Sequence, residues 1–180
     1  MWSTVYHYFR PWKNGGIWTC VQRSMYQQAR WQAGRTACPS VVIMDGQSVK
    51  TTERRGIPGF DAHKRVKGRK RHILVDTFEQ LMACRVEPAD ISDRKAAGLL
   101  LGGLGPLFPN IRTVIADAGH QSAELARHLL CRDGRKLQIV KRRQRAFKIT
   151  GFTWIVERSF AWLGRNRLFE QGLRVLRAEL

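Results

Sequence analysis

The chain has 180 residues, enough for one domain with a buried core and a small appendage. Its 32 Lys and Arg residues against 14 Asp and Glu leave a net charge of +18, which predicts a polyanionic partner. The basic residues are not confined to one amphipathic stretch, no apolar run approaches the ~20 residues that cross a bilayer, and no secretory signal is visible, so a membrane role is not expected. The four cysteines are scattered without a C-x-x-C pair. They predict neither a zinc site nor a disulfide framework, and they fit a reducing cytoplasm.

The N-terminal residues predict two helices. Ser3 is a candidate cap for a first helix that runs to about Trp12, and a second helix spans 17–33 after a Gly15-Gly16 break. Aromatic side chains recur along both helices, and this spacing favours a small core over a docking face. These aromatic residues are Trp2, Tyr6, Phe9, Trp12 and Trp18.

From Ser40 onward the pattern changes to strands that later alternate with helices. The predicted strands are 40–45, 71–77, 81–87, 112–117 and 136–141, and the predicted helices are 93–104, 122–132 and a last one from residue 153. The order β-β-β-α-β-α-β-α predicts an α/β fold with a mixed sheet. Its first three strands would form a meander.

Two of the predicted strands end in a single aspartate. Asp45 follows the apolar run 41–44, and Asp117 follows the run 114–116. Each aspartate alone is equally well read as a turn starter. Together, on separate strands, they favour a site, because α/β proteins build their sites at the ends of strands.

A single glutamate, Glu157, lies in the last predicted helix. It shares a helical face with Ala161 and Arg165, although a plain surface glutamate is the alternative. Three carboxylates that converge at one edge of a sheet repel one another unless they share a cation. The acids therefore predict a divalent-metal site, and oxygen ligands favour Mg²⁺.

Basic residues are clustered on both sides of these acids. The clusters carry one sign of charge, which favours contact with phosphates over a merely solvated surface. Such contacts hold the nucleic-acid backbone without reading its sequence. His120, shortly after Asp117, is a candidate contact to a phosphate or a leaving group, and equally a loop residue; His63 and His72 receive no role.

Four segments carry a resemblance to a known family. They are MDGQSVKT (44–51), GRKRHILVDT (68–77), ADAGH (116–120) and WIVERSFAWLGRNR (154–167). Together they resemble the bacterial insertion-sequence transposases of the DDE type, in the branch of the insertion-sequence-four and -five superfamily with a ribonuclease-H-like catalytic domain. The similarity runs from about Trp2 to Arg167.

The resemblance implies a function and a set of site residues. Asp45, Asp117 and Glu157 would bind two Mg²⁺ ions, with Mn²⁺ as an alternative, for DNA strand cleavage and transfer. The partners would be double-stranded DNA, both transposon ends and target, and further copies of the chain in an active homo-oligomer, located in the cytoplasm at the nucleoid. The expected DNA-binding residues are Lys50, Lys64, Arg65, Lys67, Arg69, Lys70, Arg71, Lys141, Arg142, Arg143, Arg158, Arg165 and Arg167.

The resemblance also divides the chain. We expect a helical N-terminal segment at 1–36, a ribonuclease-H-like DDE domain at 37–168 and an atypical tail at 169–180. The tail departs from the relatives, which continue with a segment similar to Leu-Ser-Lys-Asp-Tyr-Glu. This predicts a truncated or frameshifted copy whose tail is out of frame. A basic DNA-binding remnant without activity and a metal-dependent nuclease of the same fold are the alternative functions.

Overall fold

The computed structural model describes residues 2–50, 59–140 and 153–165. The chain divides into an N-terminal unit, Met1–Cys38, and a second unit, Pro39–Leu180. The predicted tail at 169–180 lies outside the described residues.

Two helices form the N-terminal unit. They are α1 (Trp2–Asn14) and α2 (Ile17–Gln32), and Gly16 between them adopts a left-handed conformation with φ of 70°. Phe9 and Trp12 contact Trp18, with ring centroids 5.9 and 5.6 Å apart. Nevertheless Tyr6, Trp12 and Trp18 remain 39 to 49% exposed, so the expectation that the aromatic residues form a core is wrong. Two helices that meet only near their junction enclose too little space to bury rings of this size.

The second unit is built on a mixed sheet of six strands. The strands are β1 (Val41–Lys50), β2 (Gly59–Asp61), β3 (Val66–Asp76), β4 (Leu81–Pro88), β5 (Thr113–Asp117) and β6 (Lys136–Val140). Strands β1, β3 and β4 form an antiparallel meander, and β5 and β6 run parallel to β1 on its other side. The predicted α/β fold with a mixed sheet is confirmed.

The first strands are longer than predicted. In the structure β1 continues past Asp45 to Lys50, where it pairs with the start of β3, and the short β2 adds a further antiparallel partner to β3. These extensions are rich in Lys, Arg, Gln and Ser. The apolar alternation that marks a strand is therefore absent from them, although the backbone ladder is complete.

In the described ranges, three α-helices and one short 3₁₀ helix accompany the sheet. They are α3 (Asp93–Gly102), η1 (Ala118–His120), α4 (Ala123–Asp133) and α5 (Thr153–Gly164). Ser92 and Ser122 cap α3 and α4, since their hydroxyl oxygens accept from the backbone N–H groups of Lys95 and Leu125 at 3.4 and 3.2 Å. No helix in the described ranges combines the length and the apolar character needed to cross a bilayer.

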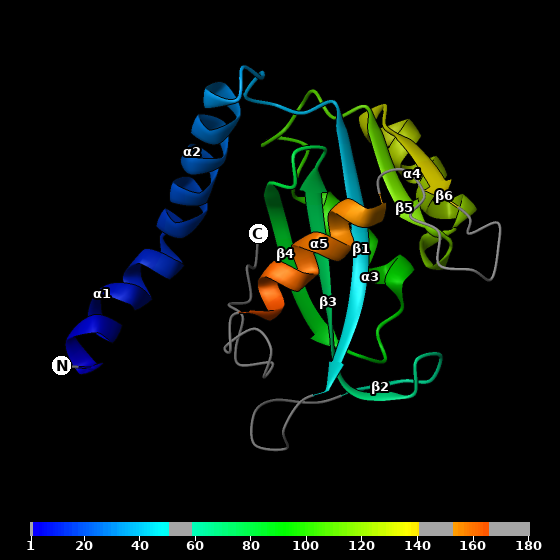
Figure 1. Ribbon diagram of the computed structural model, residues 1–180, viewed down its shortest axis with the longest axis horizontal. Helices are drawn as coiled ribbons and strands as arrows, with labels where there is room; N and C mark the ends of the chain where they lie inside the picture. The colour runs from blue at the N-terminus through cyan, green and yellow to red at the C-terminus, as the bar shows by residue number, and fades with distance from the viewer. Residues whose placement is uncertain (1, 51–58, 141–152, 166–180) are drawn as a thin grey trace. The chain divides into compact units, whose positions relative to one another are not determined.

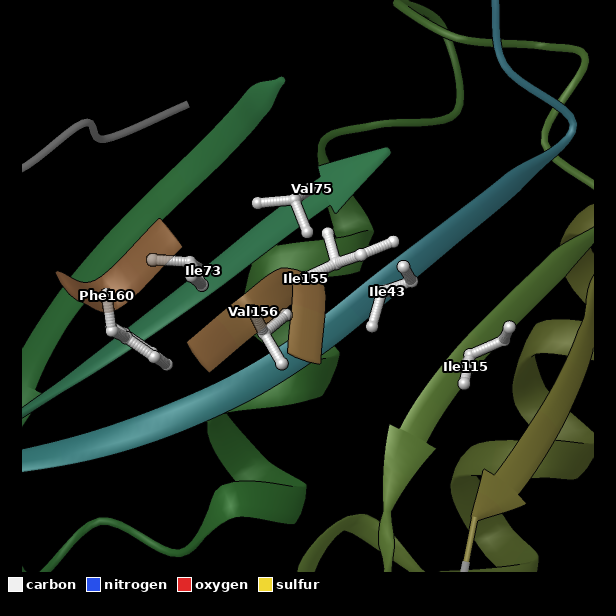
Figure 2. Close-up of a cluster of buried hydrophobic side chains, with 7 residues drawn as sticks. All are labelled: Ile43, Ile73, Val75, Ile115, Ile155, Val156 and Phe160. Atoms are coloured by element: carbon white, nitrogen blue, oxygen red, sulfur yellow. The ribbon is translucent and has the colours of Figure 1, made fainter. Parts of the chain in front are cut away.

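Helix α5 crosses one face of the sheet over β1 and β3, whereas α3 lies behind the sheet and packs against β3 and β4 (Figure 1). The core on the α5 side joins side chains from both layers, as Figure 2 shows. The helix contributes Ile155, Val156 and Phe160, and the sheet contributes Ile43, Ile73, Val75 and Ile115. This packing holds α5 on β1 and β3.

Candidate functional site

The register of β1 and β5 brings Asp45 and Asp117 to neighbouring positions. The two strands are parallel, and Met44 pairs with Ala116, so the next residue of each strand is an aspartate. Side chains alternate between the faces of a sheet. Because Ile43 and Ile115 both pack under α5, the aspartates two residues later lie on that same face.

Glu157 comes from the helix that covers this face. The buried Ile155 and Val156 fix the first turns of α5, and Glu157 follows on its exposed side. Glu157 and Asp45 line one cavity of about 510 Å³, together with Lys64 and Arg71. The structure therefore places Asp45 beside Asp117 and gives Asp45 and Glu157 a common cavity, but Asp117 is not among the residues that line it.

The electrostatics of the two aspartates differ. Burial, with the nearby charge of Asp117 adding to it, raises the pKa of Asp45 to about 6, although the N–H of Gly46 donates to its Oδ1 at 2.7 Å. The pKa of Asp117 is lowered, mainly because Nδ1 of His120 donates to its Oδ1 at 2.5 Å. Two adjacent carboxylates, one of them shielded from water, form an oxygen donor set that a divalent cation fits.

A second group of titratable side chains lies next to the aspartates. Potential ligand atoms of His72, Asp93 and His120 all lie within 4.8 Å of one another. Burial lowers the pKa of His72 to about 4, so its ring is neutral at pH 7. No spacing or motif in the sequence connects these three residues. His72 lies in a strand rich in basic residues. Asp93 is the first residue after a helix cap, a position where acidic residues are common.

The basic residues that the resemblance assigned to DNA lie in different environments. Lys50, Lys64, Arg65, Lys67, Arg158 and Arg165 are exposed, and Arg69 is half-buried. Arg71 is buried but lines the cavity, and it donates to Oε1 of Gln47 at 2.7 Å. Lys70 is enclosed, with its Nζ 3.1 Å from Asp93 and 3.4 Å from Asp61. Lys141, Arg142, Arg143 and Arg167 lie outside the described residues.

An antiparallel meander extended by two parallel strands, with helices on the sheet, Asp45 inside β1 and Asp117 at the end of β5, is the predicted ribonuclease-H-like arrangement. The family model described as "Transposase DDE domain" matches residues 36–171, and the chain belongs to this family. The resemblance noted in the sequence is thereby confirmed. The family generally uses a divalent metal ion.

The comparison with solved structures gives a more distant similarity. One chain of the cryo-electron microscopy structure of a simian T-cell lymphotropic virus intasome in complex with the PP2A regulatory subunit B56 gamma is 17% identical, with a TM-score of 0.46. The match covers 71% of this chain and 40% of that chain, so the present chain spans less than half the length of that relative. None of the curated proteins matches this chain.

Proposed function

We propose that this domain cleaves DNA strands at transposon ends and transfers them to target DNA, with two Mg²⁺ ions, or Mn²⁺ in their place, held by Asp45, Asp117 and Glu157. The observation that supports this most is the position of Asp45 and Asp117 side by side on one sheet face, with Glu157 lining the cavity of Asp45. When bound, such cations stabilise the attacking and leaving oxygens of an in-line displacement.

The residues around the acids have supporting roles in this proposal. His120 orients the carboxylate of Asp117 through its Nδ1–H, and the N–H of Gly46 does the same for Asp45. Both contacts leave other carboxylate lone pairs available to a cation. His120 is accordingly a positioning residue in the proposed reaction.

Cationic side chains lie where a phosphodiester would enter. Lys64 and Arg71 line the cavity that holds Asp45 and Glu157, and Nζ of Lys64 is 3.1 Å from the carbonyl oxygen of Gly46. They would neutralise the phosphate beside the acids. We therefore propose double-stranded DNA as the partner and a homo-oligomer as the active form.

Cleavage of defined duplexes tests this function. The full chain is incubated with Mg²⁺ and linear duplexes that carry the terminal inverted repeats found beside its gene, and with matched duplexes that lack the repeats. We expect cleavage only at the repeats, and loss of cleavage in Asp117→Asn and Glu157→Gln. Cleavage of every duplex would instead indicate a nuclease, and binding without cleavage would indicate a DNA-binding remnant.

Salt dependence tests the proposed DNA surface. A protein that contacts 6–10 phosphates loses about 10³ to 10⁵ in affinity between 50 and 200 mM salt. We expect a decrease of this size, and we expect Lys67→Gln to reduce the slope of log affinity against log salt by about 0.9. Lys95→Gln, an exposed lysine on α3 at the opposite face of the sheet, is the matched control and should leave the slope unchanged. Fluorescence anisotropy of a labelled duplex measures both; equal slopes for the two variants would exclude Lys67 from the contact surface.

A further inference from the structure

We propose that His72, Asp93 and His120 form a separate binding site for a single transition-metal ion, with Zn²⁺ as the best match to two imidazoles and one carboxylate. Imidazole nitrogen is a common ligand of zinc, whereas Mg²⁺ prefers oxygen ligands. The site therefore differs in chemistry from the proposed Mg²⁺ site of Asp45, Asp117 and Glu157. It also does not depend on whether the domain cleaves DNA.

Three elements that are distant in sequence supply the ligands. His72 lies in β3, Asp93 begins α3, and His120 ends the short helix η1 after β5. Their potential ligand atoms lie within 4.8 Å of one another, whereas donor atoms on one zinc ion are typically about 3.3 Å apart for bonds of about 2 Å. A contraction of roughly 1.5 Å at most, within the range of small side-chain rotations, would complete the site.

Both imidazoles are buried with unused nitrogen atoms. His72 is 0% and His120 is 1% exposed. Within the described part of the chain, the two ring nitrogens of His72 have no hydrogen-bond partner. The same holds for Nε2 of His120. A buried polar atom without a partner destabilises the fold. One nitrogen of His72 and Nε2 of His120 belong to the set of ligand atoms that converge with Asp93, which indicates that the native environment contains a further group there.

The hydrogen bond of His120 prepares it to bind a metal. A carboxylate can only accept, so Oδ1 of Asp117 at 2.5 Å from Nδ1 places the ring proton on Nδ1. In the neutral ring the lone pair is then on Nε2, the atom without a partner. Metal-bound histidines usually donate their other N–H to a carboxylate in this way.

Two glycines border the cluster closely. A Cβ at Gly46 would lie 3.0 Å from Nδ1 of His72 and 3.4 Å from Oδ1 of Asp93, and a Cβ at Gly119 would lie 3.0 Å from Oδ2 of Asp93. A side chain at either position would press on the ligand atoms. The absence of a Cβ at both positions keeps this space open.

An ordinary ion pair accounts for only part of the cluster. Nζ of Lys70 is 3.1 Å from Oδ1 of Asp93, which gives that carboxylate a positive partner. This ion pair does not provide hydrogen-bond partners for the three imidazole nitrogens. Lys70 has only donors, and it forms its ion pairs with Asp93 and Asp61. Its charge lowers the affinity for a cation, while the nearby carboxylates of Asp45 and Asp117 act in the opposite direction.

Cobalt titration tests the site directly. Co²⁺ replaces Zn²⁺ in such sites and gives visible d–d absorption, so the full chain is purified without metal and titrated with Co²⁺ and then with Zn²⁺ as competitor. We expect saturation at one equivalent and displacement of cobalt by zinc. Asp93→Asn and His120→Gln should each weaken binding at least tenfold, and circular dichroism without metal should show that both variants are folded.

Two matched variants make the outcome specific. His128→Gln removes an exposed histidine on α4, and Glu157→Gln removes an acid of the proposed Mg²⁺ site; both should bind cobalt like the unmodified chain. Absence of a visible spectrum from the unmodified chain would overturn the proposal. So would a spectrum that persists in both ligand variants, one that disappears in Glu157→Gln, or a strong near-ultraviolet thiolate band that assigns the ion to cysteine.

Discussion

Asp45→Asn is expected to reduce Mg²⁺-dependent strand cleavage by about 10³-fold or more, because an amide cannot supply the charge that holds the cation. The same change should stabilise the metal-free domain at pH 7. Burial and the charge of Asp117 raise the pKa of Asp45 from 3.8 to about 6, so the ionised carboxylate is unfavourable in the fold. Shifting the pKa this far corresponds to a destabilisation of up to about 3 kcal/mol at pH 7.

The direction of the pH dependence follows from the raised pKa. The folded state holds its proton at a pH where the unfolded chain has already lost it. The contribution of Asp45 to stability is therefore fully present below about pH 4 and is lost as the pH rises to about 6. Among the charged groups near Asp45, Asp117 raises its pKa further, whereas His120 and Lys64 lower it.

Single-turnover cleavage in the presence of Mg²⁺ measures the first effect. Urea unfolding between pH 4 and 8, in the presence of a chelator, measures the second. Asp90→Asn changes an exposed aspartate in the same way and should alter neither. If Asp45→Asn cleaves within tenfold of the unmodified chain, Asp45 does not hold the cation. If the variant keeps the loss of stability between pH 4 and 6, that loss arises from another group.

The pair of aspartates shows what the sequence could predict of the site. Apolar runs before Asp45 and Asp117 predicted two strands, and the structure shows them parallel and in register. The serine caps of α3 and α4 were also readable, because a cap is a local signal. Helix starts and apolar strand cores depend on a few neighbouring residues, so a single sequence reveals them.

The His72, Asp93 and His120 cluster shows what the sequence could not predict. No spacing relates the three residues, because the contact depends on how α3 and η1 pack on β3. The polar half of β3 was missed for a related reason. Its residues form a regular ladder with β1, but neither face of this part of the strand is apolar. Arg71 lies at the cavity on one face, and Lys70 forms ion pairs on the other.

Ile155→Ala should reduce the free energy of unfolding by about 2–5 kcal/mol, which makes it the largest stability effect we expect. Ile155 is 2% exposed and packs with Ile43, Val75 and other residues under α5. Removing three carbon atoms leaves a cavity between the helix and the sheet. Because this contact holds the helix that carries Glu157, the proposed cleavage activity should fall as well, even though Ile155 lies outside the cavity lining.

A graded series separates this packing effect from a general loss of stability. Ile155→Val should cost about 0.5–1.5 kcal/mol, and Leu130→Ala, at a side chain on α4 that is 61% exposed, should stay within about 0.5 kcal/mol. Urea unfolding gives the three free energies, and cleavage is assayed under conditions where each variant is folded. An Ile155→Ala variant as stable as Leu130→Ala would show that α5 is not anchored through this core. The position of Glu157 at the cavity of Asp45 would then lose its structural basis.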